Sequence, residues 1–206
     1  MYQTHAMKTE RFSKALLLTC ILVSAFLMLM KHANAASTPG NDALVLSSEH
    51  KDHLTVLDGL TVVANADAPS TTANTLKTSA IDNHITVVTF FASWCPPCLH
   101  EFKALNEIQS ELGKENVTIV AVNVFEKFDN NDEARMAKFL RTTQPQFTVL
   151  KGTEQSRKLF GNVNRIPTLL VFDKNGNMAF DFVHARGATK QSVDSAELLE
   201  AIRPLL

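Results

Sequence analysis

The segment from Phe90 to Cys98 reads Phe-Phe-Ala-Ser-Trp-Cys-Pro-Pro-Cys and ends an apolar, β-branched run that begins at Ile85. This order predicts a strand buried on both faces that delivers two thiols to the first turn of a helix. A helix N-terminus lowers the pKa of a nearby thiol and supplies the thiolate that disulfide exchange requires. We therefore expect Cys95 to attack a substrate disulfide and Cys98, one turn later, to resolve the mixed disulfide.

The chain has three cysteines, and their positions limit their roles. Cys20 lies in an apolar N-terminal run, so only Cys95 and Cys98 remain in the part expected to fold. A zinc site takes about four ligands, and no second Cys-x-x-Cys or His-x-x-x-His completes one. A c-type haem attachment needs His directly after the second cysteine, where Leu99 stands. Redox work is therefore favoured over an inert structural disulfide, with no metal expected.

Phe91-Ala92-Ser93-Trp94-Cys95-Pro96-Pro97-Cys98, with Glu101 three residues later and Ile166-Pro167-Thr168 downstream, resembles the TlpA/ResA/DsbE-like branch of the thioredoxin superfamily. The resemblance extends from about Leu54 to the C-terminus. It implies a thioredoxin-like α/β fold, with a central mixed sheet flanked by helices and the central insertion typical of TlpA proteins. It also implies that the two cysteines are the redox pair and that Pro167 is a cis-proline facing them.

Four residues are expected to contact a substrate: Trp94, Ile166, Pro167 and Thr168. Trp94 is expected to pack beside the attacking thiol, at the rim of the cysteine motif, with its amphipathic ring. The Ile-Pro-Thr segment forms a wall against which a substrate chain can lie. The resemblance implies that the backbone of Ile166 faces outward there, where it can pair with an extended client by short strand addition.

Glu101 has two open interpretations, a solvated carboxylate on the helix or a group that takes protons during exchange. The second is implied by an acidic residue that is common at this position in the branch. Thr89 stands where thioredoxin carries a buried Asp, so its presence makes Glu101 the stronger candidate for proton transfer. His100 is expected to face water, with stabilisation of the thiolate as a less favoured role.

The remaining chain alternates strand and helix patterns. Helices are expected over residues 96–112, 129–142, 153–160 and 192–202. Strands are expected over residues 85–92, 117–124, 147–150, 168–173 and 178–184. Residues 54–63 contain two apolar runs around Asp58-Gly59, which predicts a hairpin with a type I′ turn.

Residues 1–35 read as a signal peptide or an N-terminal membrane anchor. Basic residues precede an apolar stretch from Ala15 to Met30, and Ala33 and Ala35 form an Ala-x-Ala cleavage pattern. The stretch is shorter than the roughly 18 apolar residues of a spanning helix, which favours cleavage. Residues 36–53 are expected to be a linker and residues 54–206 the thioredoxin-like domain, located in the bacterial periplasm either free or anchored to the inner membrane.

Three function classes compete, and an exported thiol–disulfide oxidoreductase leads. Pro96 and Pro97 withhold N–H donors from a Cys95 thiolate, which favours a reductant or isomerase of protein disulfides over a strong oxidant. The alternative is a thiol peroxidase on the same broad fold. It is disfavoured because residues 91–95 do not supply the Pro-x-x-x-Thr/Ser-x-x-Cys setting of a peroxidatic cysteine. The third class, a redox-inert or metallochaperone module, is disfavoured because only two thiols are available.

The expected partners are protein disulfide substrates and a protein thiol that donates electrons at the inner membrane. The formal net charge of −1 gives no basic surplus for nucleic acid. No nicotinamide or flavin fingerprint occurs, so no cofactor is expected. Membrane contact is expected only if the N-terminal segment stays uncleaved. The client stays open between apocytochrome c and other proteins, since residues 161–168 lack the carboxylate that cytochrome-specific members often carry.

Overall fold

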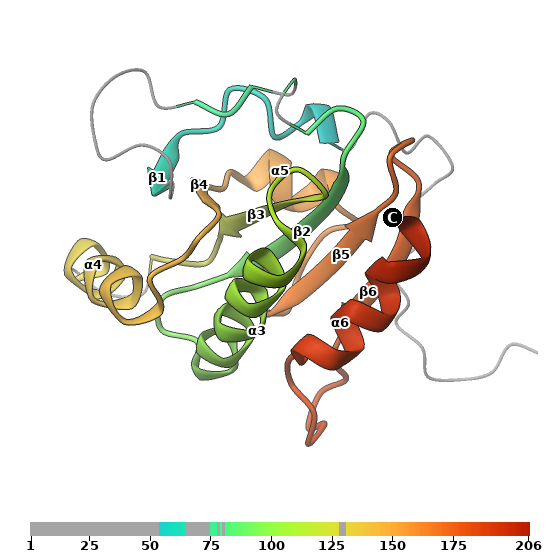
Figure 1. The fold of residues 1–206 in the computed structure, drawn as a ribbon. Coiled ribbons are helices and arrows are strands. Elements are labelled where there is room, and N and C mark those ends of the chain that lie inside the picture. The colour runs from blue at the N-terminus through green and yellow to red at the C-terminus, as the bar shows by residue number, and fades with distance from the viewer. Residues whose placement is uncertain (1–53, 65–74, 78, 80, 128–130) are drawn as a thin grey trace, which may run out of the picture. The chain divides into compact units, whose positions relative to one another are not determined.

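The computed structural model describes residues 54–64, 75–77, 79, 81–127 and 131–206. Six strands form one mixed sheet in the order β1-β4-β3-β2-β5-β6 (Figure 1). They are β1 (Val62–Ala64), β2 (Ile85–Phe91), β3 (Val117–Asn123), β4 (Thr148–Lys151), β5 (Thr168–Phe172) and β6 (Met178–Val183). The pairs β2–β3 and β3–β4 are parallel, while β1–β4, β2–β5 and β5–β6 are antiparallel. The expected central mixed sheet is confirmed.

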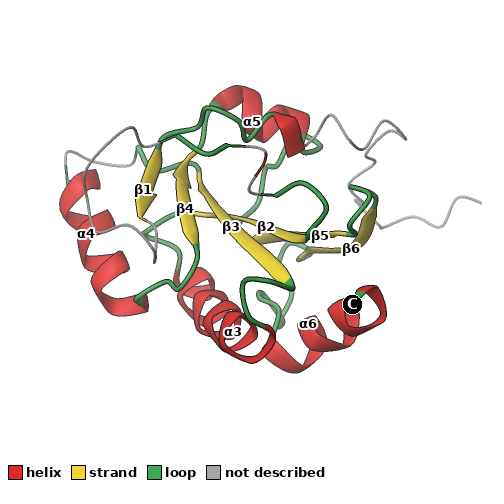
Figure 2. Ribbon diagram, turned by 45° about the horizontal axis from the view of Figure 1, so that its top comes forward, coloured by secondary structure: helices red, strands yellow, loops and turns green. Residues whose placement is uncertain are grey.

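Helices cover both faces of this sheet. They are α3 (Pro96–Leu112), α4 (Asp132–Thr143), α5 (Glu154–Leu159) and α6 (Ser195–Ile202), followed by the short 3₁₀-helix η2 (Arg203–Leu205). Figure 2 shows α3, α4 and α6 on one face and α5 on the other. The chain passes from β2 through α3 to β3, so the two cysteines lie where a central strand gives way to a crossover helix.

Strand β2 is the centre of the core, and all seven of its residues are buried. Successive side chains of a strand point to opposite faces of the sheet. Val87 and Phe91 accordingly join the cluster beneath α3, whereas Val88 and Phe90 join the cluster on the α5 side. A strand that must be apolar on both faces explains why this part of the sequence shows no alternation.

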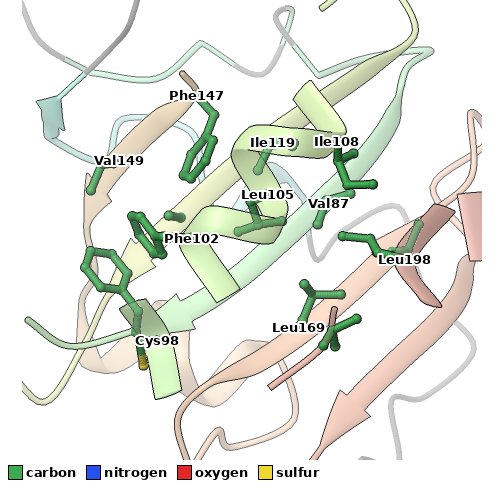
Figure 3. Close-up of a cluster of buried hydrophobic side chains, with 14 of the residues drawn as sticks. Val87, Cys98, Phe102, Leu105, Ile108, Ile119, Phe147, Val149, Leu169 and Leu198 are labelled. Atoms are coloured by element: carbon green, nitrogen blue, oxygen red, sulfur yellow. The ribbon is translucent and has the colours of Figure 1, made fainter. Parts of the chain in front are cut away.

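One face of α3 anchors the helix to the sheet. Figure 3 shows Cys98, Phe102, Leu105 and Ile108 among the buried side chains of this cluster. The ring of Phe102 packs against three other aromatic rings at centroid distances of 4.7, 4.8 and 5.2 Å, those of Phe91, Phe139 and Phe147. This packing fixes the first turn of α3, and with it the position of Cys98.

The ends of α3 agree with the sequence. Cys95 is the N-cap residue, and the two prolines occupy the first helical positions, where a missing N–H costs little. The helix ends at Gly113, which has a positive φ of 74° and donates its N–H to the carbonyl of Gln109 at 3.1 Å. A positive φ directly after the last turn favours glycine, which has no Cβ.

The hairpin expected over residues 54–63 is wrong. The N–H of Leu57 donates to the carbonyl of Leu54 at 3.1 Å, which forms a helical turn. Leu54, Leu57 and Leu60 are all buried in one cluster, and their spacing of three suits a helical turn rather than alternation along a strand. Only Val62–Ala64 forms a strand, and it pairs antiparallel with β4 instead of with the preceding residues.

Helix α6 begins later than expected, at Ser195 instead of residue 192. The side chain of Asp194 accepts a hydrogen bond from the N–H of Glu197 at 2.9 Å and so caps the helix. The expected signal segment (1–35) and linker (36–53) lie outside the described residues. Within the described ranges, no helix combines the length and apolar character needed to cross a bilayer.

Candidate functional site

Cys95 and Cys98 form a disulfide at the junction of β2 and α3, with their Cα atoms 5.4 Å apart. Cys98 is fully buried in the core beneath α3. Cys95 is 3% exposed and also lines a surface cavity. The two sulfurs therefore differ in access, because only the one at the helix N-cap borders solvent.

The cavity beside the disulfide has a volume of about 390 Å³. Its lining residues come from the cysteine segment, the loop after β3, the segment before β5 and the end of β6: Trp94, Cys95, Pro96, Pro97, Phe125, Asn164, Arg165, Ile166 and His184. A larger cavity of about 680 Å³ lies between β1 and α4, but no cysteine lines it. We therefore take the smaller cavity as the candidate site.

The cavity brings Trp94 and Ile166 together beside Cys95, as expected for residues that contact a substrate. The Ile166–Pro167 peptide bond is cis, as the resemblance implied, and Pro167 is buried. Thr168 is buried as well, and its hydroxyl donates to the carbonyl of Arg165 at 2.9 Å. The side chain of Thr168 thus holds the turn before β5, while Ile166 reaches the cavity.

Trp94 is 40% exposed and is oriented by the loop after β3. Its indole Nε1 donates a hydrogen bond to the carbonyl of Phe125 at 2.8 Å. Phe125 is likewise 40% exposed and lines the same cavity. Two aromatic side chains from segments about thirty residues apart therefore border Cys95.

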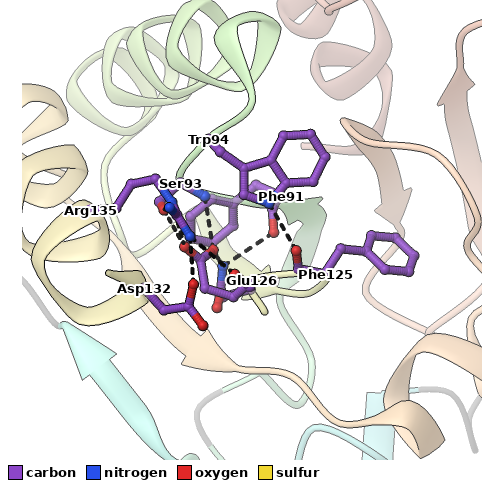
Figure 4. A network of polar contacts seen from close by, with 8 residues as sticks. Phe91, Ser93, Trp94, Phe125, Glu126, Asp132 and Arg135 are labelled. Carbon is purple, nitrogen blue, oxygen red and sulfur yellow. Dashed lines mark hydrogen bonds and ion pairs between the residues drawn. The ribbon is translucent and has the colours of Figure 1, made fainter. Parts of the chain in front are cut away.

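A polar network ties this loop to the residue before Trp94 (Figure 4). Glu126 accepts hydrogen bonds from the backbone N–H and the hydroxyl of Ser93, and from Asn123 Nδ2 at 2.7 Å. Arg135 of α4 donates from Nε to Ser93 Oγ at 3.2 Å and lies 3.6 Å from Glu126 Oε1. Asp132 Oδ1 accepts from Arg135 Nη2 at 2.6 Å. The cysteine segment is thereby held to β3 and α4 by partly buried, charged hydrogen bonds.

Glu101 is buried, not solvated, with 1% of its surface exposed. Its Oε1 accepts a hydrogen bond from the Thr89 hydroxyl. Within the described part of the chain, Oε2 has no hydrogen-bond partner, although the backbone amide of Val193 also favours the charged form. Burial outweighs both influences and raises the pKa of Glu101 to about 7. Glu101 therefore titrates near neutral pH, one helical turn after Cys98.

Several residues of the site were missed from the sequence. Phe125, Glu126 and Arg135 lie 31 to 42 residues from their partners in the cysteine segment. Two of them are charged residues that a solvent-facing loop or helix would also carry, and no motif marks them. His100 is exposed, as expected. No cluster of three His, Cys, Asp or Glu side chains that could hold a metal ion occurs among the residues described.

Comparison with known proteins places this geometry in a family. The AhpC/TSA family matches residues 61–180, more than half of the chain. The thiol-disulfide oxidoreductase ResA of Geobacillus thermodenitrificans is 31% identical over 115 residues, which cover 56% of this chain and 61% of ResA. The chain thus spans less than two thirds of the length of the ResA proteins that it matches.

Two solved structures share the fold. A thiol:disulfide interchange protein of the thioredoxin family from Chlorobium tepidum has a TM-score of 0.55 and 20% identity, covering 72% of this chain and 94% of that one. A secreted disulfide oxidoreductase of Mycobacterium tuberculosis, homologous to Escherichia coli DsbE, has a TM-score of 0.56 and 17% identity, covering 75% of this chain and 98% of that one. The thioredoxin-like fold and the resemblance to ResA and DsbE proteins are confirmed, and the chain belongs to the AhpC/TSA family.

Proposed function

We propose that this chain is a thiol–disulfide oxidoreductase that reduces disulfide bonds in protein clients. The observation that carries the proposal is the Cys95–Cys98 disulfide at a helix N-terminus, with Cys95 on the wall of an open cavity. A cavity bordered by Trp94 and Ile166 offers apolar surface to a polypeptide beside the reacting sulfur. The partial match to ResA, a thiol-disulfide oxidoreductase, supports the same chemistry.

The reaction begins from the reduced dithiol. The Cys95 thiolate attacks one sulfur of the client disulfide, so that a mixed disulfide forms and the other client sulfur leaves as a thiolate. Cys98 then loses its proton and attacks the sulfur of Cys95, which closes the Cys95–Cys98 disulfide and releases the second client thiolate. Two electrons pass to the client, whose thiolates take up protons from solvent. A protein dithiol must then reduce the chain again.

Glu101 is proposed to take the proton of Cys98 during the second attack. The two residues are three apart on α3, a spacing that brings side chains to one face of a helix. A pKa of about 7 suits a group that accepts and releases protons near neutral pH. Thr89 orients the carboxylate by donating to Oε1, from a strand position beside the cysteine segment.

The direction of electron flow is proposed from the first turn of α3. Pro96 and Pro97 occupy the first helical positions and carry no N–H, while the N–H of Cys98 points at the Cys95 carbonyl at 3.2 Å. Few backbone donors therefore face a Cys95 thiolate, and the dithiol form gains little stabilisation. Such a protein suits reduction of clients better than their oxidation.

A thiol peroxidase is the second candidate, because the AhpC/TSA match alone does not separate the two chemistries. The residues seven and three positions before Cys95 are Val88 and Ala92, both buried and apolar. They provide no hydroxyl beside the thiol of the kind a peroxidatic cysteine usually has. Exchange with a client disulfide is therefore favoured.

The N-terminal segment is the basis for a proposal about where the protein acts and what reduces it. We propose export by residues 1–35 to the periplasm, with contact to the inner membrane only if that segment is retained. The electron donor is then a protein thiol at the inner membrane. The identity of the client stays open, and apocytochrome c is one candidate among several.

The test compares two oxidants. Pre-reduced protein is mixed with an excess of a disulfide-bonded protein such as insulin, or with hydrogen peroxide, and formation of the Cys95–Cys98 disulfide is followed by thiol alkylation and mass spectrometry. We expect oxidation by insulin with release of two client thiols, and none in a Cys95→Ser variant. Rapid oxidation by peroxide with no reduction of insulin would favour the peroxidase and overturn the proposal.

A further inference from the structure

Phe125 combines exposure with an uncommon backbone conformation. Its ring is 40% exposed, although phenylalanine is usually buried. Its φ of 55° lies in the left-handed region, which bulky side chains rarely occupy. A residue in such a conformation persists only where its surroundings hold it there, and such residues cluster at functional sites.

The surroundings of Phe125 hold it firmly. Its carbonyl accepts the indole N–H of Trp94, and the next residue, Glu126, is bound by the backbone and side chain of Ser93. The residue before it, Val124, donates its N–H to the carbonyl of Phe91 at 2.8 Å. Every one of these contacts ties the loop to the segment that leads directly into Cys95.

One face of the Phe125 ring is covered by a cation. The guanidinium carbon of Arg157 lies 5.6 Å from the ring centroid, within the range of a cation–π contact. Arg157 is itself held by Glu154 and by the carbonyl of Val163. The ring therefore has a defined position rather than free rotation into solvent.

This arrangement presents two aromatic side chains next to the reacting sulfur. Figure 4 shows the rings of Trp94 and Phe125 projecting away from the polar network that anchors them. Both line the cavity that Cys95 borders. An extended segment that placed its half-cystine against Cys95 would bring a neighbouring side chain against these rings.

The charge of the cavity lining also indicates which charged side chain a bound segment would carry. Arg165 contributes a positive charge to the lining, and none of the described lining residues carries a carboxylate. An acidic side chain in the bound segment is therefore favoured over a basic one.

We propose that Phe125 is a client-recognition residue that, with Trp94, receives an apolar side chain adjacent to the half-cystine of the client. Arg165 favours a carboxylate in the same segment. The bound partner is thus an extended, disulfide-containing polypeptide whose cysteine has an apolar neighbour and an acidic residue nearby. The inference rests on the proposed exchange activity and names its substrate class.

The experiment uses three disulfide-linked peptide dimers that differ at one position each. The first carries Leu beside Cys and an Asp, the second replaces Leu by Ser, and the third replaces Asp by Lys. Pre-reduced wild-type protein is mixed with each, and the rate of Cys95–Cys98 formation is measured after acid quenching. The variant is Phe125→Gly, because glycine adopts a positive φ without strain while the substitution removes the side chain that carries the ring.

Gln144→Gly is the matched control. Gln144 also has a positive φ, 44°, but it caps the end of α4 and does not line the cavity. Urea unfolding of Phe125→Gly and Gln144→Gly verifies that each variant folds, since glycine relieves the strain of a positive φ at both positions. Phe125→Ser is a second variant that lacks the ring.

We expect the wild type to react about tenfold faster with the Leu peptide than with the Ser peptide, a ratio that corresponds to about 1.4 kcal/mol. Phe125→Gly and Phe125→Ser should reduce that ratio to about twofold or less, and Gln144→Gly should keep it. The Lys peptide should react more slowly than the Asp peptide. An unchanged ratio in both Phe125 variants would overturn the inference while leaving exchange activity intact, whereas no reduction of any peptide would overturn the proposed function itself.

Discussion

The buried carboxyl group of Glu101 is expected to make the stability of the folded chain depend on pH. With a pKa of about 7 in the folded chain and 4.5 in the unfolded chain, this group holds its proton more tightly when the chain is folded. Below pH 4.5 both states are protonated and its full contribution to stability is present. As the pH rises through about 7, the folded chain must ionise a buried group, and that contribution is lost.

The size of the loss follows from the two pKa values. Each pH unit between them is worth about 1.4 kcal/mol, so ionised Glu101 costs ~3 kcal/mol relative to the protonated group. The Glu101→Gln variant keeps an oxygen that can accept from the Thr89 hydroxyl but cannot ionise. Its amide NH₂ replaces an oxygen that has no hydrogen-bond partner among the described residues, a change whose cost does not vary with pH.

The assay is urea unfolding of the oxidised wild type and of oxidised Glu101→Gln between pH 4.5 and 8.5. Use of the oxidised form keeps the cysteines out of the titration. We expect the free energy of unfolding of the variant, relative to that of the wild type, to rise by ~3 kcal/mol between the acidic and the alkaline end of this range. Glu107→Gln, which removes an exposed carboxylate from the same helix, is the control. Parallel curves for the wild type and Glu101→Gln would refute the assignment of a buried, protonated carboxyl group.

Three further predictions concern the core and the redox pair. Phe102→Ala should lower the free energy of unfolding by about 3–5 kcal/mol in the same assay, because it empties a site packed by three aromatic rings. Equilibration with glutathione should give a reduction potential near roughly −250 mV, and a value above about −150 mV would contradict a reductant. Glu101→Gln should slow reduction of a disulfide peptide above pH 7 and shift the pH dependence of the rate, and an unchanged pH–rate profile would return Glu101 to a structural role.

The junction of β2 and α3 was predictable because its determinants are local. A continuous apolar run, two prolines and two cysteines stand next to one another in the sequence, and each favours the structure found. A strand at the centre of a sheet is covered on both faces, so a continuous apolar run predicts such a strand. The secondary structure at this junction and the pairing of Cys95 with Cys98 could therefore be predicted from adjacent residues.

The burial of Glu101 could not be decided in this way. Glu is usually exposed on a helix, and the neighbouring Phe102 and Leu105 already account for the apolar face of α3. What buries Glu101 lies elsewhere in the chain, at Thr89 on β2 and near Val193 before α6. Its environment is a product of tertiary packing.

Phe125 was missed for a different reason. It stands directly after the strand expected over residues 117–124, two residues beyond the end of β3, and no motif in the adjacent sequence marks it. Its positive φ depends on hydrogen bonds to Trp94 and Ser93, which join the loop only when the sheet has formed. The hairpin expected over residues 54–63 was wrong for a similar reason, since the buried leucines at 54, 57 and 60 pack in a cluster that includes residues of β2, β3 and β5.

The central claim is that Cys95 attacks a client disulfide and Cys98 resolves the product. It is tested most directly with reduced Cys98→Ser protein and a disulfide-linked peptide dimer, with Cys95→Ser as the matched control. Because the resolving thiol is absent, the account predicts that one peptide accumulates on Cys95 of the Cys98→Ser variant, detected by intact mass and peptide mapping. Accumulation of the adduct on Cys98 in the Cys95→Ser variant, with none on Cys95 of the Cys98→Ser variant, would contradict it.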